Sequence, residues 1–420
     1  MKTPILPEAE SFAYRDGRLF IEDVAVEELA ERFGTPLYAY SLAHVRSQYE
    51  RLGRALGDLT PSIHYAVKAN SCGALIRVLA AMGAGADVVS GGELFRARRA
   101  GIPAHRIVFA GVGKTVEEIE YALREDIGGF TVESEPELER LSECARRAGT
   151  KARIAIRVNP DVAPQTHIYT STGRKESKFG VDPERARRAY ERAATLPGIE
   201  IAGMHMHLGS PLADERPYAE ALDKVAALCV WLKERFPTCT TLDLGGGMGI
   251  PYRRRQKPFD LAAFAAAVVP RVRATGLGLA LEPGRYIVGN AGLLVARVQY
   301  IKENAFRRFV ITDAGMNDLI RPPLYHAWHE IVAVRESAEH FRADIVGPIC
   351  ESGDFLAQGR RLPAVREGDL VAVMSAGAYG FAMASNYNSR GRAAEVVVER
   401  AEARLARRRE GWADLVAAET

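Results

Sequence analysis

The sequence predicts a TIM-type (β/α)8 barrel followed by a C-terminal β-domain, that is, an α/β fold plus an all-β one. From residue 36 to 285, short β-branched runs alternate with longer amphipathic helical segments, and eight such units can be counted. After Arg285 the helical intervals largely disappear, and strand-like runs follow one another with turns between them. At 420 residues the chain is long enough for two domains.

Each predicted barrel strand is a short, mostly apolar run. The eight runs begin at Ile63, Ala86, Arg106, Gly129, Arg153, Ile201, Thr241 and Leu279. The segments between them place apolar residues three and four positions apart with charges opposite, which is typical of outer barrel helices, and Ser90 with Glu93 has the spacing of a capping box. Because periodicity does not show whether the ring of strands closes, an open doubly wound sheet is the alternative.

The predicted domain limits are 1–35, 36–285 and 286–420. A hairpin is expected around Asp16-Gly17, so residues 1–35 should contribute to the β-domain of residues 286–420, with the barrel inserted between them. Strand-like runs in that β-domain begin at Leu293, Arg307, Glu330, Arg342, Asp369 and Arg392. The polar stretch from Pro160 to Gly180 is a loop long enough to suggest a function.

Composition narrows the class of protein without naming an activity. A hydrophobic share of 47% with 26% charged residues is typical of a globular protein. A net charge of +3, with Lys and Arg scattered, argues against nucleic acid as a partner, and we interpret the run Arg407 to Arg409 as a solvated surface. There is no apolar run long enough for a membrane span and no signal-peptide pattern.

Five cysteines without a C-x-x-C pair argue against a disulfide framework or zinc site, so we expect a cytoplasmic protein.

Polar side chains gather where the predicted strands end, which is where barrel enzymes keep their reactive groups. Lys68 ends the first strand and His207 the sixth, a glycine run from Gly245 to Gly247 ends the seventh, and Glu282 with Arg285 ends the eighth. An amine, an imidazole, a loop of the phosphate-binding type and a carboxylate are therefore expected at one end of the barrel.

Each of these groups has a plain structural alternative. Lys68 lies among Ala66, Val67 and Ala69, which would desolvate its ammonium and favour use as a nucleophile, but a lone lysine after a strand is commonly just exposed. Glycines 245 to 247 offer unobstructed backbone N–H groups to a phosphate, although such runs also form simple turns.

The carboxylate and the imidazole have alternatives of their own. Glu282 ends an apolar strand, a costly position without a cationic partner. That partner would be a protonated pyridine nitrogen or, alternatively, Arg285. His207 is expected to stack on a flat cofactor, with Ser210 supplying a hydroxyl to phosphate. The alternatives are a packed histidine or a metal pair with His205, but no third ligand of suitable spacing is evident, so no metal site is predicted.

With these residues assembled, the chain resembles the fold-type III pyridoxal-phosphate-dependent decarboxylases, whose barrel is of the alanine-racemase-like kind, and within them the diaminopimelate decarboxylases. The likeness covers nearly the whole chain. The matching segments, in order, are HYAVKAN, GADVVSGGEL, FAGVGKT, RVNPDV, STGRKESKFG, HLGS, LDLGGG, EPGRYIVGNAG, DAGMNDLIRPPLY, VGPICESGDFLA and SAGAYGFAMASNYNSR. One departure is Pro211, where related sequences have glutamine after HLGS.

The resemblance implies a role for each matching residue. Lys68 would carry pyridoxal phosphate as a Schiff base, Glu282 would contact the pyridine nitrogen, and His207 would stack on the ring. The rest of the implied cofactor site is Ser210, Gly246, Gly247, Gly284, Arg285 and Tyr379. The implied substrate-binding residues are Arg285, Arg321, Tyr325, Glu351 and Tyr379, and Cys350 would protonate the product carbon.

The resemblance also implies a homodimer with shared active sites, in which Cys350 and Glu351 reach the site of the neighbouring subunit. The expected activity is decarboxylation of meso-2,6-diaminopimelate to L-lysine, the last step of lysine biosynthesis, and Arg321 would select the substrate's distal carboxylate. The alternatives are a decarboxylase of ornithine, lysine or arginine on the same fold, an alanine racemase, which Glu282 disfavours, and a non-catalytic carrier of the cofactor.

Overall fold

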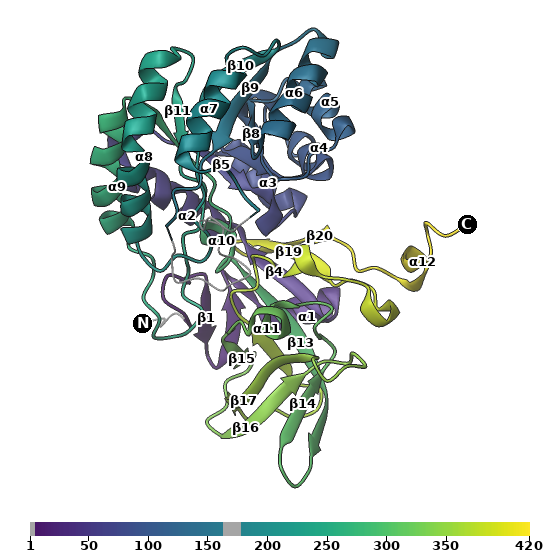
Figure 1. Cartoon of the computed structure of the whole chain (residues 1–420). Helices are drawn as coiled ribbons and strands as arrows, with labels where there is room; N and C mark the ends of the chain where they lie inside the picture. The colour runs from purple at the N-terminus through teal and green to yellow at the C-terminus, as the bar shows by residue number, and fades with distance from the viewer. Residues whose placement is uncertain (1–4, 163–177) are drawn as a thin grey trace. The chain divides into compact units, whose positions relative to one another are not determined.

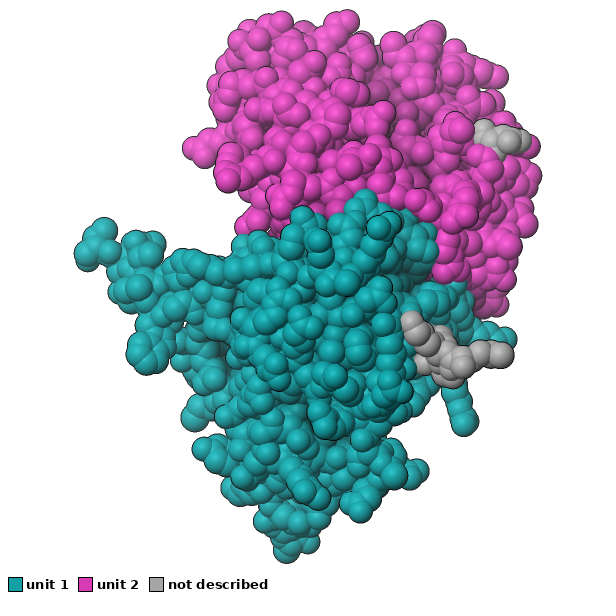
Figure 2. Space-filling model, turned by 180° about the vertical axis from the view of Figure 1, so that it is seen from behind, with its two compact units in different colours: residues 1–48, 250–258, 285–420 teal, residues 49–249, 259–284 magenta. Residues whose placement is uncertain are grey.

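The chain divides into two compact units, which Figure 2 shows in two colours. Unit 1 comprises residues 1–48, 250–258 and 285–420, and unit 2 comprises residues 49–249 and 259–284. The structure is a computed structural model that describes residues 5–162 and 178–420. Most of the polar loop predicted from Pro160 to Gly180 therefore lies outside the described residues.

Unit 2 is built on a closed barrel of eight parallel strands, which confirms the predicted fold and excludes the open doubly wound sheet. In the ring each strand pairs with its neighbours in sequence, and the last pairs with the first. The strands are β5 (Ser62–Ala66), β6 (Gly85–Val88), β7 (Ile107–Phe109), β8 (Gly129–Val132), β9 (Ala152–Arg157), β10 (Ile199–His205), β11 (Thr241–Asp243) and β12 (Gly278–Leu281).

Helices surround these strands, as Figure 1 shows. They are α3 (Gly73–Ala81), α4 (Gly91–Arg99), α5 (Val116–Arg124), α6 (Glu135–Ala148), α7 (Pro183–Ala193), α8 (Arg216–Arg235) and α9 (Leu261–Thr275). The start of α5 follows from local sequence, because Thr115 and Glu118 form a full capping box there. At α4 the predicted box is half formed: Ser90 accepts from the Glu93 amide, but the Glu93 carboxylate accepts from the Val89 amide instead.

Unit 1 is mostly β-structure. The predicted hairpin is present, with β1 (Phe12–Arg15) and β2 (Arg18–Ile21) antiparallel around Asp16 (φ 48°) and Gly17 (φ 73°), and β3 (Val24–Ala25) completes a three-stranded sheet. The larger sheet contains β4 (Leu37–Ser41), β13 (Gly292–Glu303), β14 (Arg308–Thr312), β15 (Ile331–Ala333), β16 (His340–Val346), β17 (Phe355–Pro363), β18 (Leu370–Val373), β19 (Ala394–Glu399) and β20 (Glu402–Arg407).

Short helices complete unit 1: α1 (Val26–Phe33), α10 (Arg285–Val288), α11 (Arg321–Tyr325) and α12 (Trp412–Leu415), while α2 (Leu42–Ala55) runs across the limit between the units in sequence. The sequence-based limit lay between residues 35 and 36, before β4. In the structure β4 pairs with β13 and β19 and so belongs to the sheet of unit 1. No helix among the described residues is long and apolar enough to cross a membrane.

Candidate functional site

In unit 2, five ionisable side chains gather at the C-terminal ends of the barrel strands, and we call them the barrel cluster: Lys68, Asp87, His205, Asp243 and Glu282. Asp87, His205 and Asp243 lie at or near the ends of β6, β10 and β11, and Glu282 directly follows β12. Lys68 follows β5 in a 3-10 turn. The prediction from strand ends found Lys68 and Glu282, whereas both aspartates were read only as parts of strands.

Lys68 forms an ion pair with Asp87. Its neighbours Ala66, Val67 and Ala69 are buried as expected, but the amine lies beside a carboxylate rather than in a purely apolar environment. Asp87 is fully buried, and one of its carboxylate oxygens has no hydrogen-bond partner among the described residues. Burial raises its pKa, and so does nearby Glu282, while Lys68 works in the opposite direction.

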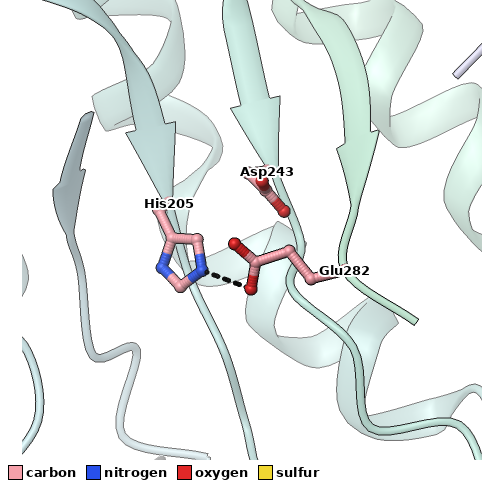
Figure 3. A group of neighbouring side chains, drawn as sticks. All are labelled: His205, Asp243 and Glu282. Carbon is pink, nitrogen blue, oxygen red and sulfur yellow. Dashed lines mark hydrogen bonds and ion pairs between the residues drawn. The ribbon is translucent and has the colours of Figure 1, made fainter. Parts of the chain in front are cut away.

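Glu282 is buried, and its Oε2 lies 3.2 Å from Nε2 of His205 (Figure 3). Burial alone would raise the pKa of this carboxyl, but His205 and Lys68 outweigh burial and hold it well below its usual range. The carboxylate is therefore charged, and its Oε1 has no hydrogen-bond partner in the described part of the chain. A buried, charged and half-unpaired acid is suited to accept a hydrogen bond from a cationic N–H group.

Asp243 completes a group with His205 and Glu282 (Figure 3), in which one nitrogen or oxygen atom from each side chain lies within 4.8 Å of the other two. Such a group has the residue types of a metal site. Burial together with Glu282 raises the pKa of Asp243 to about 8. Asp243 is then protonated at neutral pH, and its Oδ1 accepts from the Gly245 amide at 2.8 Å. We therefore interpret the group as the support of Glu282.

The glycine run after β11 is a tightly packed loop. A Cβ on Gly246 would lie 2.3 Å from the Glu282 carbonyl oxygen, and one on Gly247 (φ 112°) would lie 2.4 Å from that of Gly209. The Gly246 amide donates to Nδ1 of His207 at 3.2 Å, whereas Nε2 of His205 lies beside Glu282. Burial and Arg157 lower the pKa of His207 well below its usual value, which leaves a neutral, flat ring.

Unit 1 contains a second group, which we call the arginine cluster: Tyr252, Arg285, Arg321, His329 and Tyr379. Both arginines are buried. Arg285 Nη1 donates to the Tyr252 hydroxyl at 2.5 Å and its guanidinium lies 4.9 Å from the Tyr379 ring centre. Arg321 lies 5.0 Å from the Tyr252 ring centre. Two buried cations held by neutral partners form a site for an anion.

His329 supports Arg321 in this cluster and was not foreseen from sequence. Its Nε2 lies 2.8 Å from Arg321 Nη1, and its Nδ1 lies 2.8 Å from the Met374 carbonyl oxygen. Because a carbonyl accepts only, Nδ1 carries the proton and Nε2 accepts from the arginine. Burial and Arg321 lower the pKa of His329 well below its usual value, so the histidine holds Arg321 without neutralising it.

The remaining predicted residues have these places. Ser210 follows β10 in unit 2, and Gly284 packs so closely that a Cβ there would lie 2.8 Å from that of Ala69. Tyr325 ends α11. Cys350 and Glu351 are exposed between β16 and β17, where the Cys350 amide donates to Asn388 Oδ1 at 2.8 Å.

Comparisons with known proteins agree with this chemistry. The family model described as "Pyridoxal-dependent decarboxylase, pyridoxal binding domain" matches residues 42–289. A diaminopimelate decarboxylase of Aquifex aeolicus is 51% identical over 404 residues, 95% of each chain. A diaminopimelate decarboxylase structure from M. jannaschii in complex with L-lysine has a TM-score of 0.93 at 39% identity and covers 98% of both chains.

A decarboxylase of different specificity is more distant. The lysine/ornithine decarboxylase of Vibrio vulnificus, solved with putrescine, has a TM-score of 0.79 at 27% identity and covers 89% of this chain and 97% of that one. The fold is therefore similar even in a decarboxylase whose sequence is much less similar to this chain.

Proposed function

This chain belongs to the diaminopimelate decarboxylase family of pyridoxal-dependent decarboxylases, and from that premise we propose how its own residues divide the work of the reaction. The activity is decarboxylation of meso-2,6-diaminopimelate to L-lysine and carbon dioxide, with pyridoxal phosphate as cofactor. The observation that carries the assignment is Glu282, a buried and charged carboxylate with one oxygen unpartnered among the described residues.

The barrel cluster fits pyridoxal phosphate. Lys68 would hold its aldehyde, the free oxygen of Glu282 would accept from its pyridine N–H, and the flat ring of His207 would stack on it. The loop of Gly246 and Gly247, with Ser210, Gly284, Arg285 and Tyr379, would hold its phosphate, because backbone N–H groups of such a loop can bind an anion. When bound, the cofactor supplies an aldehyde for amines and a cationic ring that accepts the electron pair left by carbon dioxide.

Within this arrangement the protein's acids and bases control where protons reside. Glu282, kept ionised by His205, favours the protonated pyridine nitrogen. Asp87 would hold the ammonium of Lys68 once the substrate amine has replaced it, because the two already form an ion pair. Cys350 would deliver the proton to the product carbon.

Substrate choice is assigned to the arginine cluster. Arg321 and Arg285, with Tyr325 and Tyr379, would bind the distal carboxylate that diaminopimelate has and that lysine, ornithine and arginine lack. Glu351 would accept the distal ammonium. A hydrogen bond between charged groups contributes about 1.5–3 kcal/mol, so basic amino acids should be poorer substrates by roughly tenfold or more.

A homodimer with shared active sites is part of the proposal. Cys350 and Glu351 are exposed, whereas a proton donor needs a site protected from water, and a second copy would provide that protection. The described cysteines are free thiols, which supports work in the reducing cytoplasm. We propose small-molecule partners only, with no nucleic acid or membrane.

A substrate panel tests the proposed specificity. Carbon dioxide release from meso-diaminopimelate, L-lysine and L-ornithine would be measured for the wild type, Arg321→Met and Arg254→Met, the last a control at an exposed arginine paired with Glu330. The wild type and the control should prefer diaminopimelate by about tenfold or more, and Arg321→Met should lose that preference. Equal rates on all three substrates by the wild type would refute the specificity.

A further inference from the structure

The barrel contains a cavity of about 520 Å³ near the N-terminal ends of its strands. Its wall includes first residues of several strands, among them Ser62, Gly85, Gly129 and Thr241. In most barrels this interior is filled by layers of branched side chains. Here Gly203, Ala155 and Ala280 also belong to the wall, so small residues leave a space within the size range of ligand sites, roughly 300–1,000 Å³.

Arginines give the wall of this cavity its positive charge, because burial lowers the pKa of His64 and disfavours its cationic form. Its basic residues are His64, His105, Arg106, Arg153 and His205, and its single acidic lining residue is Asp243. Arg153 is paired with Asp126 at 2.6 Å. Arg106 donates to the Gly83 carbonyl oxygen at 2.7 Å, and no ion pair links it to a carboxylate in the described part of the chain. An uncompensated guanidinium at a concave wall attracts anions.

A second, independent observation comes from His205, which also lines the cavity. The residue is 1% exposed, and its Nδ1 has no hydrogen-bond partner among the described residues, whereas its Nε2 is taken by Glu282. In Figure 3 the unpartnered nitrogen lies on the side of the ring away from Glu282. A buried ring nitrogen without a partner is unusual in a native protein and needs an explanation.

We propose that this cavity binds a small organic anion, a carboxylate without an ammonium group. We further propose that the bound anion changes the environment of Glu282 through His205, which contacts both the cavity and Glu282. The apolar part of the wall, from Ile63, Val108, Phe130 and Met204, suits the carbon body of an organic acid. An amino acid such as the substrate or product would bring its ammonium against the arginines. The site is therefore distinct in chemistry from the substrate site.

The test uses the holoenzyme and calorimetric titration with malonate. Malonate should bind, the diamine cadaverine should not, and Arg106→Met should weaken malonate binding about tenfold or more. Arg140→Met, at an exposed arginine of α6, is the matched control and should bind as the wild type does. Ala155→Met, which fills the cavity and keeps its charges, should also abolish binding, and circular dichroism would verify that each variant is folded.

The effect of the bound anion on Glu282 is measured in a separate experiment, through the visible absorbance of the bound cofactor. Malonate should shift that spectrum in the wild type and in Arg140→Met but not in Ala155→Met. The proposal is overturned if malonate does not bind, if Arg106→Met and Ala155→Met bind it unchanged, or if malonate competes with diaminopimelate. Inorganic phosphate binding as tightly as malonate would overturn the assignment to an organic acid.

Discussion

At the scale of single residues, the protonation state of each acid in the barrel cluster depends on the charges of its neighbours. Glu282 is ionised although buried, because His205 and Lys68 stabilise its charge more than burial opposes it. Asp243 shows the opposite outcome, since burial beside Glu282 raises its pKa to about 8. Two carboxyls of one group thus differ in protonation, and only Glu282 is available as a charged partner for a cationic ring.

The first prediction concerns this charge. Glu282→Gln should lower kcat by on the order of 100-fold, because a neutral amide no longer favours the protonated pyridine nitrogen. Cofactor content, measured by absorbance, should stay near one per chain, since Lys68 is unchanged. Glu200→Gln, on the same strand as His205, serves as control. A kcat within twofold of wild type would show that Glu282 does not support the electron sink.

The second prediction concerns His329 as a positioning residue. His329→Leu removes the acceptor of Arg321 and should raise KM for diaminopimelate about tenfold, with a smaller change in kcat. His329→Gln, which can both accept and donate, should recover part of the loss. His340→Leu, at an exposed histidine of the same unit, should leave KM unchanged. If leucine and glutamine behave alike, His329 acts only in packing.

The sequence pointed to candidate residues that have a recognisable position or motif, but it did not point to the residues that contact and support them. Lys68, His207 and Glu282 were found because strand ends are where barrels place reactive groups. Asp87 and Asp243 were missed, although the argument made for Glu282, an acid in an apolar strand, applies equally to ADVV and TLDL. Tyr252 and His329 had no such signal, because neither ends a predicted strand. Although Arg321 is only 8 residues before His329, only folding places the two side chains in contact.

At the scale of elements, the closed barrel explains why the glycine loop after β11 is so constrained. The loop must pass from the strand end to the next segment while its backbone lies against that of Gly209 and Glu282. The eight barrel strands were predictable because each is a short apolar run between amphipathic helices. In contrast, β17 and β20 were not predicted, because QGRRL and EARLAR contain few apolar residues and so do not stand out as strand-like runs.

The third prediction separates close packing from backbone strain. Gly247→Ala should weaken cofactor binding at least tenfold, because the new Cβ would meet the Gly209 carbonyl oxygen at 2.4 Å. Gly101→Ala is the matched control, since Gly101 also has a positive φ (95°) but an added Cβ meets nothing within 4 Å. Equilibrium titration of the apoprotein with pyridoxal phosphate measures the cofactor affinity of both variants. Equal losses in the two variants would attribute the effect to strain alone.

At the scale of the whole molecule, the β-domain is assembled from pieces far apart in the chain. β4 pairs in parallel with β19, and the N-terminal hairpin joins the same unit as the C-terminal strands. The sequence predicted that arrangement for residues 1–35 through the Asp16-Gly17 turn. The predicted barrel limits, residues 36–285, included β4, although the first predicted barrel strand began only at Ile63.

The fourth prediction tests the shared active sites. Lys68→Ala and Cys350→Ala should each be nearly inactive alone. If Cys350 serves the partner's site, mixing the two under conditions of subunit exchange should restore about a quarter of wild-type activity, because half of randomly paired dimers contain one intact site. No recovery, with exchange demonstrated by a tag, would mean that each subunit uses its own Cys350.

The proposed chemistry requires that pyridoxal phosphate is attached to Lys68. Borohydride reduction of the purified holoenzyme followed by peptide mass mapping measures this directly. If Lys68 holds the cofactor, the visible absorbance should be lost and a phosphopyridoxyl group should appear on the peptide that contains Lys68. Protein that takes up no cofactor, or a label on a different lysine, would contradict it.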